Sequence, residues 1–76
     1  MKTLEKEIRE IMETITPGLP EIDEHTLLDD IWFDLFSKEL LARDLEEKYQ
    51  IIISDPEIDH WITFGDIVAT VERYQH

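Results

Sequence analysis

The sequence predicts a small, irregular all-α bundle built from three main helices, one short helix and a long first loop. Two observations predict this fold class. Apolar residues recur at intervals of three and four along three segments, which is the helical period, and no two segments pair convincingly as strands. The chain of 76 residues is short enough to form a single domain over residues 1–76, and it has no cysteine to brace the fold.

The first helix is predicted to begin at Leu4, with Thr3 as its cap, and to end near Thr16. Its apolar residues are spaced for one buried face: Leu4, Ile8, Ile11, Met12 and Ile15. Pro17 and Gly18 end this helix, because proline lacks the backbone N–H that a helix interior needs. The pattern is typical of an amphipathic core helix.

Residues 17–33 are predicted to form the long first loop. This connection is longer than the about 2–8 residues usual between bundle helices, so it should have its own packing or a function. Five apolar residues are expected to anchor it to the core: Leu19, Ile22, Leu27, Leu28 and Ile31. The acidic residues between them should stay in solvent. They lack the spacing of a calcium loop, so no metal site is predicted.

The second helix is predicted to begin at Asp34, a good N-cap, and to end at Tyr49. At about 100° per residue, its core face consists of Leu41, Ala42, Leu45 and Tyr49. Phe36 and Leu40 point away from that face. Either the long loop covers them, or they form an exposed apolar patch of the kind that marks a binding site. Trp32 and Phe33 could enlarge such a patch or cover it.

The last third of the chain is predicted to hold a connector, a short helix and a final helix. Residues 51–53 read as an extended connector inserted into the core. Asp55 and Pro56 look like the N-cap and first residue of a short helix that ends by His60, with an overlapping capping box at Ser54 and Glu57. Thr63 should cap the last helix, with Asp66 three residues on. The apolar stripe of that helix comprises Phe64, Ile67, Val68, Val71 and Tyr74.

The charge balance limits the classes of partner. The chain has 19 acidic side chains against 7 basic ones, a net charge of −12. Such a field repels nucleic acids and anionic membrane surfaces and favours basic protein surfaces. No apolar run is long enough for a membrane span, so we expect a cytoplasmic location. We also expect a monomer. Three scattered histidines and no recognisable nucleophile predict that the protein is not an enzyme and has no catalytic or metal site.

Three stretches of the chain resemble the acyl carrier protein family, whose members bind phosphopantetheine. The stretch from Leu27 to Phe36 matches the family's loop-helix signature, which contains an acid pair, Leu-Gly, a variable residue and Asp-Ser-Leu. Residues 45–49 match its Leu-Glu-Glu-x-Phe, and residues 61–66 match its Ile-Thr-Thr-Val-Gly-Asp. The resemblance covers nearly the whole chain without a gap from Leu27 to Val71. It implies an acyl-carrier-like four-helix fold.

The chain departs from this family at the attachment site. Leu35 stands where the family has the serine that carries phosphopantetheine, and Trp32 replaces the preceding glycine. A leucine has no hydroxyl, so no phosphodiester can form there and no cofactor is expected. Ser37 is an alternative attachment point, which would make the chain an acyl, aminoacyl or peptidyl carrier in fatty-acid or polyketide-type biosynthesis.

The first hypothesis is instead an acidic interaction module that has lost the phosphopantetheine arm. Residues at matching positions of the family dock basic enzymes, which assigns partner contacts to Asp34, Glu46 and Glu47. Phe36 and Leu40, with Trp32, would supply the apolar anchor. The partner would be an acyl-transfer or other biosynthetic enzyme with a basic surface. In a third hypothesis, Trp32, Phe33 and Phe36 fill the family's acyl groove, and the domain is purely structural or regulatory.

The acidic surplus predicts that the fold is more stable when salt is added. Salt and divalent cations screen the repulsion among like charges in the compact state. We therefore expect the melting temperature to rise between low and moderate salt. A melting temperature that does not change would contradict this prediction.

Overall fold

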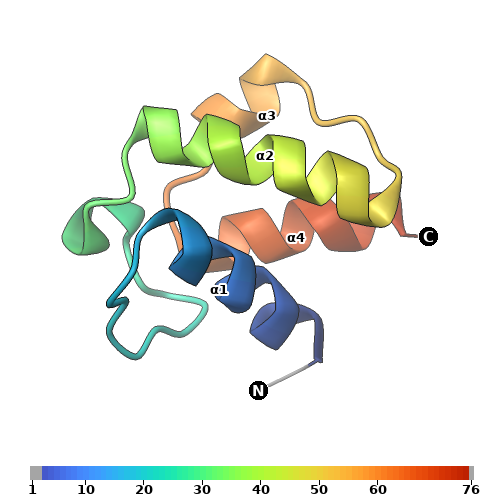
Figure 1. Cartoon of the computed structure of the whole chain (residues 1–76). Coiled ribbons are helices and arrows are strands. Elements are labelled where there is room, and N and C mark those ends of the chain that lie inside the picture. Colours follow the sequence, from blue (N-terminus) through green and yellow to red (C-terminus); the bar gives the residue numbers. More distant parts are fainter. Residues whose placement is uncertain (1–2, 76) are drawn as a thin grey trace.

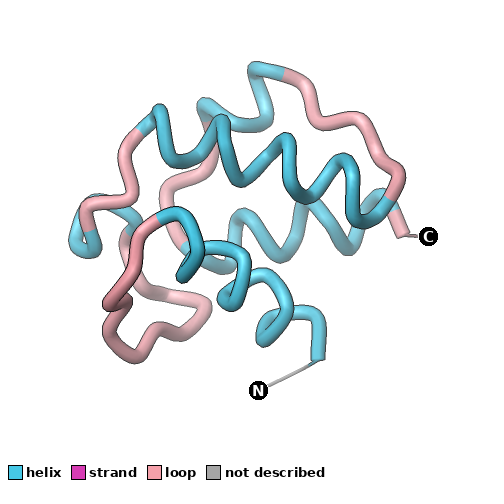
Figure 2. Tube along the Cα trace, in the orientation of Figure 1, coloured by secondary structure: helices cyan, strands magenta, loops and turns pink. Residues whose placement is uncertain are grey.

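A computed structural model describes residues 3–75 and contains four α-helices within that range: α1 (Thr3–Ile15), α2 (Leu35–Tyr49), α3 (Asp55–Asp59) and α4 (Phe64–Tyr74). A short 3-10 helix, η1 (Leu28–Ile31), precedes α2. These residues contain helices and loops but no strand (Figure 2), which confirms the all-α prediction with three longer helices and a short one.

The helices enclose one core. α1 packs against both α2 and α4, and α3 covers α2 (Figure 1). The predicted core faces are confirmed, since Ile8 and Met12 of α1 and Leu41, Ala42 and Leu45 of α2 are buried. α4 contributes Phe64, Ile67, Val68 and Val71. Tyr74, at the end of the predicted stripe of α4, is instead partly exposed, and its hydroxyl donates to the Glu57 carboxylate.

Helix ends agree with the sequence signals at most positions. Thr63 and Asp66 form a reciprocal capping box at the start of α4, as expected. At α3 the N-cap is Ser54 rather than Asp55, because the Glu57 carboxylate accepts the backbone N–H of Ser54 at 2.9 Å and fixes the cap one residue earlier. Helix α1 already includes Thr3, which is therefore not its N-cap.

The long loop lies against the connection between α3 and α4. The backbone N–H of Leu28 donates to the Ile62 carbonyl at 2.9 Å, and the N–H of Phe64 donates to the Thr26 carbonyl at 3.0 Å. Leu19, Ile22, Leu28 and Ile31 are buried as predicted. The expectation that Leu27 is also an anchor is wrong, because successive side chains of an extended segment point to opposite sides, and burying Leu28 turns Leu27 outward.

The connector after α2 enters the core at one residue. Ile53 is buried, Ile51 packs against the core cluster and Ile52 is exposed, as extended backbone requires. The Glu46 carboxylate accepts the backbone N–H of Ile53 at 2.8 Å. This bond fastens the connector to α2.

Gly65 allows the start of α4 to approach the long loop. Its N–H donates to the carbonyl oxygen of Glu24 at 3.0 Å, and a Cβ at position 65 would lie 2.7 Å from that same oxygen. Any larger residue must therefore displace the loop backbone.

We expect Gly65→Ala to lower the free energy of unfolding by about 1–3 kcal/mol, the usual range for overpacking. Alanine's better helix propensity, about 1 kcal/mol, opposes this effect but does not remove the collision. Urea denaturation measures the change. The matched variant is Gly18→Ala, because a Cβ there meets no atom within 4 Å and the cost comes only from a φ of +86°. Amide exchange at Leu28 and Phe64 should accelerate in Gly65→Ala alone, and an unchanged or higher stability of that variant would contradict the prediction.

Candidate functional site

The segment that enters α2 ends η1 with a Schellman motif. The backbone N–H of Phe33 donates to the Leu28 carbonyl at 3.0 Å, and the N–H of Trp32 lies 3.5 Å from the Asp29 carbonyl oxygen. The motif requires a left-handed residue, and Trp32 adopts it with φ 55° and ψ 31°. Leu28 and Phe33 are fully buried, which matches the apolar contact that accompanies such motifs.

Trp32 is an unusual residue for this conformation. The left-handed region disfavours side chains with a Cβ by about 1–2 kcal/mol per residue, and glycine is its usual occupant. The indole is 85 % exposed, so no burial of its own offsets that strain. Backbone strain of this kind is concentrated at functional sites in proteins.

Three neighbouring apolar side chains are exposed at this junction. Trp32 is 85 %, Leu35 53 % and Phe36 68 % exposed. We call Trp32, Leu35 and Phe36 the exposed trio. Leu40, one helical turn after Phe36, is half-buried. The long loop therefore does not cover Phe36, which decides between the two alternatives that the sequence left open for this residue, whereas Leu40 is only half-exposed.

The same exposures correct the groove-filling hypothesis. It required Trp32, Phe33 and Phe36 to be internal, but only Phe33 is buried. The left-handed turn at Trp32 is the reason, because it directs Phe33 into the core while Trp32 stays outside.

Asp34 caps α2 at the edge of the exposed trio. Its carboxylate accepts the backbone N–H of Ser37 at 2.9 Å. This bond holds the pKa of Asp34 below its ordinary value, with smaller contributions from the Ser37 hydroxyl and from Lys38. Asp34 therefore remains ionised at neutral pH. Ser37 itself is half-buried in the first turn of α2.

The other acidic candidates lie at the opposite end of α2. Glu46 and Glu47 are 12 and 13 residues beyond Asp34, or about 18–20 Å along a helix at 1.5 Å per residue. Glu46 is half-buried and bonded to the Ile53 backbone, so its carboxylate already has a structural partner. Glu47 is exposed and lines a hollow of about 420 Å³ between α1 and α2. The structure thus brings together Trp32, Asp34, Leu35 and Phe36 and leaves Glu46 and Glu47 apart.

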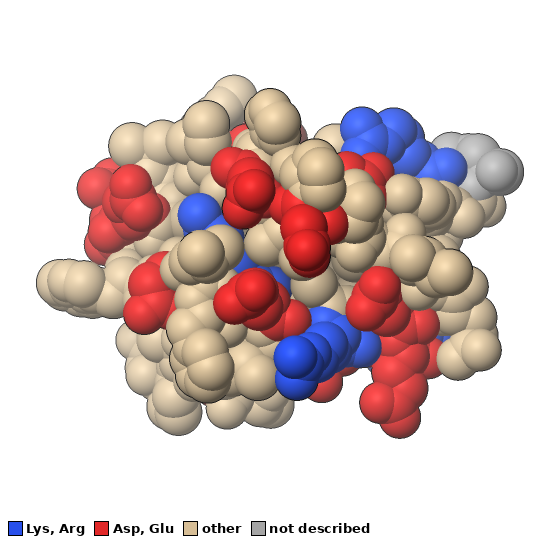
Figure 3. All heavy atoms as spheres, turned by 90° about the horizontal axis from the view of Figure 1, so that it is seen from above, with Lys and Arg blue, Asp and Glu red and all other residues tan. Residues whose placement is uncertain are grey.

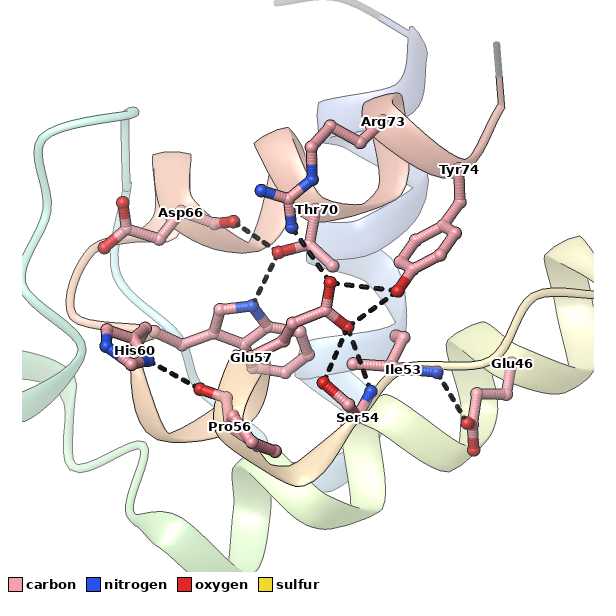
Figure 4. A network of polar contacts seen from close by, with 11 residues as sticks. Glu46, Ile53, Ser54, Pro56, Glu57, His60, Asp66, Thr70, Arg73 and Tyr74 are labelled. Carbon is pink, nitrogen blue, oxygen red and sulfur yellow. Dashed lines mark hydrogen bonds and ion pairs between the residues drawn. The ribbon is translucent and has the colours of Figure 1, made fainter.

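A hollow of about 350 Å³ between α3 and α4 is a second candidate. Figure 4 shows that its polar groups bond to one another. The Arg73 guanidinium donates to the Glu57 carboxylate at 3.1 Å, and the Tyr74 hydroxyl donates to the same carboxylate at 2.8 Å. The buried indole N–H of Trp61 donates to the Thr70 hydroxyl at 2.9 Å. These contacts hold α3 against α4, so the polar groups named here are already paired within the protein.

Other kinds of site find no support in the part of the chain that the structure describes. Residues 3–75 contain no group of three or more His, Asp or Glu side chains that could hold a metal ion. No helix in this range is long and apolar enough to cross a membrane.

Comparison with known proteins gives no relative. No protein-family model matches the chain. No curated protein and no solved structure matches it either.

Sequence reasoning missed two features of the site. It did not predict η1, whose four residues Leu28–Ile31 carry no helical repeat, and it did not assign Asp29 to the site. Asp29, Trp32, Phe33 and Asp34 line a hollow of about 300 Å³, which we call the Trp32 hollow. The sequence signals were a tryptophan where acyl carrier proteins have a glycine, and the acid pair of that resemblance, which Asp29 begins.

Replacing Trp32 by glycine should stabilise the fold. Trp32→Gly removes the left-handed strain, whereas glycine's larger chain entropy in the unfolded state opposes this effect. The free energy of unfolding should therefore rise by about 1 kcal/mol. Trp32→Ala keeps the Cβ and should bring no such gain. Urea denaturation of both variants checks this. A Trp32→Gly variant less stable than Trp32→Ala would mean that the strain is absent.

Proposed function

We propose that this chain is an acyl-carrier-like docking module that bears no phosphopantetheine arm. The exposed trio contacts a protein partner, and Asp34 and Glu47 meet basic groups on that partner. The observation that carries this proposal is the exposure of the trio at the residues that match the carriers' attachment motif. A buried trio would leave no surface for the contact.

The backbone at the junction supports the resemblance. The position that matches the family's glycine has a positive φ, which is the conformation glycine favours. Gly65, in the stretch that matches the family's Val-Gly-Asp, lies where a Cβ would collide with Glu24. Both positions thus have a physical reason to be glycine in a fold of this kind, and this chain keeps only the second.

The chemistry of Leu35 supports the loss of the arm. Leu35 is the first residue of α2, next to the N-cap Asp34, and it is half-exposed, so the position is accessible but offers no hydroxyl. The arm would need another oxygen. Ser37, which is half-buried, is the nearby alternative.

Charge supports a basic partner. The net charge of −12 attracts cationic surfaces and speeds their encounter at low salt. Acidic side chains are spread over the face that carries α2 and α3, with basic ones between them (Figure 3). The same charge opposes pairing with a second copy of this chain.

Restoring the lost residues tests the carrier likeness. The double variant Trp32→Gly/Leu35→Ser should gain one phosphopantetheine arm when it is incubated with coenzyme A and a broad-specificity phosphopantetheinyl transferase. The wild-type chain should gain none, and intact mass measures both, beside a carrier that the enzyme modifies. The variant Ser37→Ala in the restored background should still be modified. An arm on the wild type that disappears in Ser37→Ala would assign carrier function to Ser37 instead.

Docking without an arm has its own readout. The wild-type chain should slow the modification of the control carrier competitively, because it occupies the transferase without being consumed. Phe36→Ala should weaken this inhibition, whereas Ile52→Ala, which removes an exposed apolar residue far along the sequence from the trio, should not. If the wild type does not inhibit and the restored variant gains no arm, the proposal is wrong.

A further inference from the structure

The Trp32 hollow is lined by aromatic and acidic residues. Its lining consists of Asp29, Trp32, Phe33 and Asp34, and its volume is about 300 Å³. Phe33 is fully buried, so the accessible aromatic surface at the hollow is that of Trp32, which is 85 % exposed. The Schellman motif sets both side chains, because Trp32 and Phe33 are its last two residues.

Within residues 3–75, neither carboxylate of the hollow forms an ion pair with a basic side chain. The ion pairs within residues 3–75 join His25 to Glu24, Lys48 to Glu7 and Arg73 to Glu57. Asp29 and Asp34 are in none of them. Lys38 attracts Asp34 across the first turn of α2 but does not pair with it. The hollow therefore keeps a net negative charge.

An exposed indole beside two acidic residues restricts the chemistry of a ligand for this hollow. An anion is repelled, and a purely apolar group would desolvate two carboxylates without compensation. A metal ion would find only two acidic side chains. A guanidinium fits, because it can pair with carboxylates through its planar fork and stack on an indole face. The exposed Leu35 and Phe36 beside the hollow would contact apolar neighbours of the same residue on a protein.

We infer that the Trp32 hollow receives an arginine side chain of the partner protein, held between Asp29 and Asp34 and stacked on Trp32. This inference rests on the proposed docking function and specifies its partner as a surface that presents an arginine flanked by apolar residues. An arginine is preferred to a lysine, since an ammonium group is a more strongly hydrated point charge and cannot stack.

The test is an NMR titration of the full chain with N-acetyl-arginine amide at constant ionic strength. The indole N–H of Trp32 and the backbone N–H groups of residues 29–34 should shift. The indole N–H of Trp61 serves as an internal reference, because it is buried and bonded to Thr70. N-acetyl-citrulline amide, which has the same shape without the charge, should produce no such shifts.

Variants separate the hollow from the general negative field. Asp29→Asn/Asp34→Asn removes the two charges and keeps a good N-cap, because asparagine caps helices well. It should weaken binding more than Glu10→Gln/Asp44→Asn, which removes the same charge from exposed positions outside the hollow. Trp32→Leu should weaken binding by about two- to fivefold, the loss expected for a cation–π contact at an exposed site. An unchanged Trp61 signal shows that each variant is folded.

Three outcomes would overturn the inference. Citrulline could shift the same resonances, the two double variants could weaken binding equally, or the shifts could fail to localise to residues 29–34. None of these bears on arm transfer or on competition for the transferase, which are measured without the arginine probe. The docking proposal and the arginine site can therefore fail independently.

Discussion

The backbone pairing between the long loop and the start of α4 is the contact on which the placement of the exposed trio depends. Leu28, Phe64 and Gly65 each donate an N–H across this contact, and Gly65 leaves room for the Glu24 carbonyl. The pairing fixes Leu28 in the core at the first residue of η1. The Schellman motif then follows within one turn, so the placement of Trp32 is set by contacts made more than 30 residues later in the sequence.

Local propensity and fold conflict at Trp32. At most other positions they agree: Asp34, Ser54 and Thr63 are good caps, and the buried faces are apolar. Gln50, at the end of α2, is the other non-glycine residue with a left-handed backbone among residues 3–75. At Trp32 a bulky residue occupies a left-handed position and exposes its ring. Native sequences depart from local consistency mainly at functional sites, so the conflict at Trp32 adds to the support that the exposed trio gives the docking proposal.

The sequence alone allowed the helical framework to be predicted but not the details of the site. Helical periodicity predicted the core faces of α1, α2 and α4. It also placed Phe36 away from the core face of α2, but it left open whether the long loop covers that residue. The opposite fates of Trp32 and Phe33 could not be predicted, because they depend on a single left-handed residue that propensity disfavours. The hydrogen bond between the Glu46 carboxylate and the Ile53 backbone could not be predicted either. Ile53 lies in an irregular connector, where no repeating pattern shows which side chain its backbone will meet.

The exposed trio and the acidic surplus also have a joint consequence for colloidal behaviour. Three large apolar side chains in one place invite self-association. With a net charge of −12, long-range repulsion keeps two such surfaces apart at neutral pH. That protection disappears near the isoelectric point of about 4.3, where the chain's own patches become the most available partners for one another. The negative charge thus slows self-association through the patch at neutral pH, and a cationic partner of the kind proposed above would not meet this repulsion.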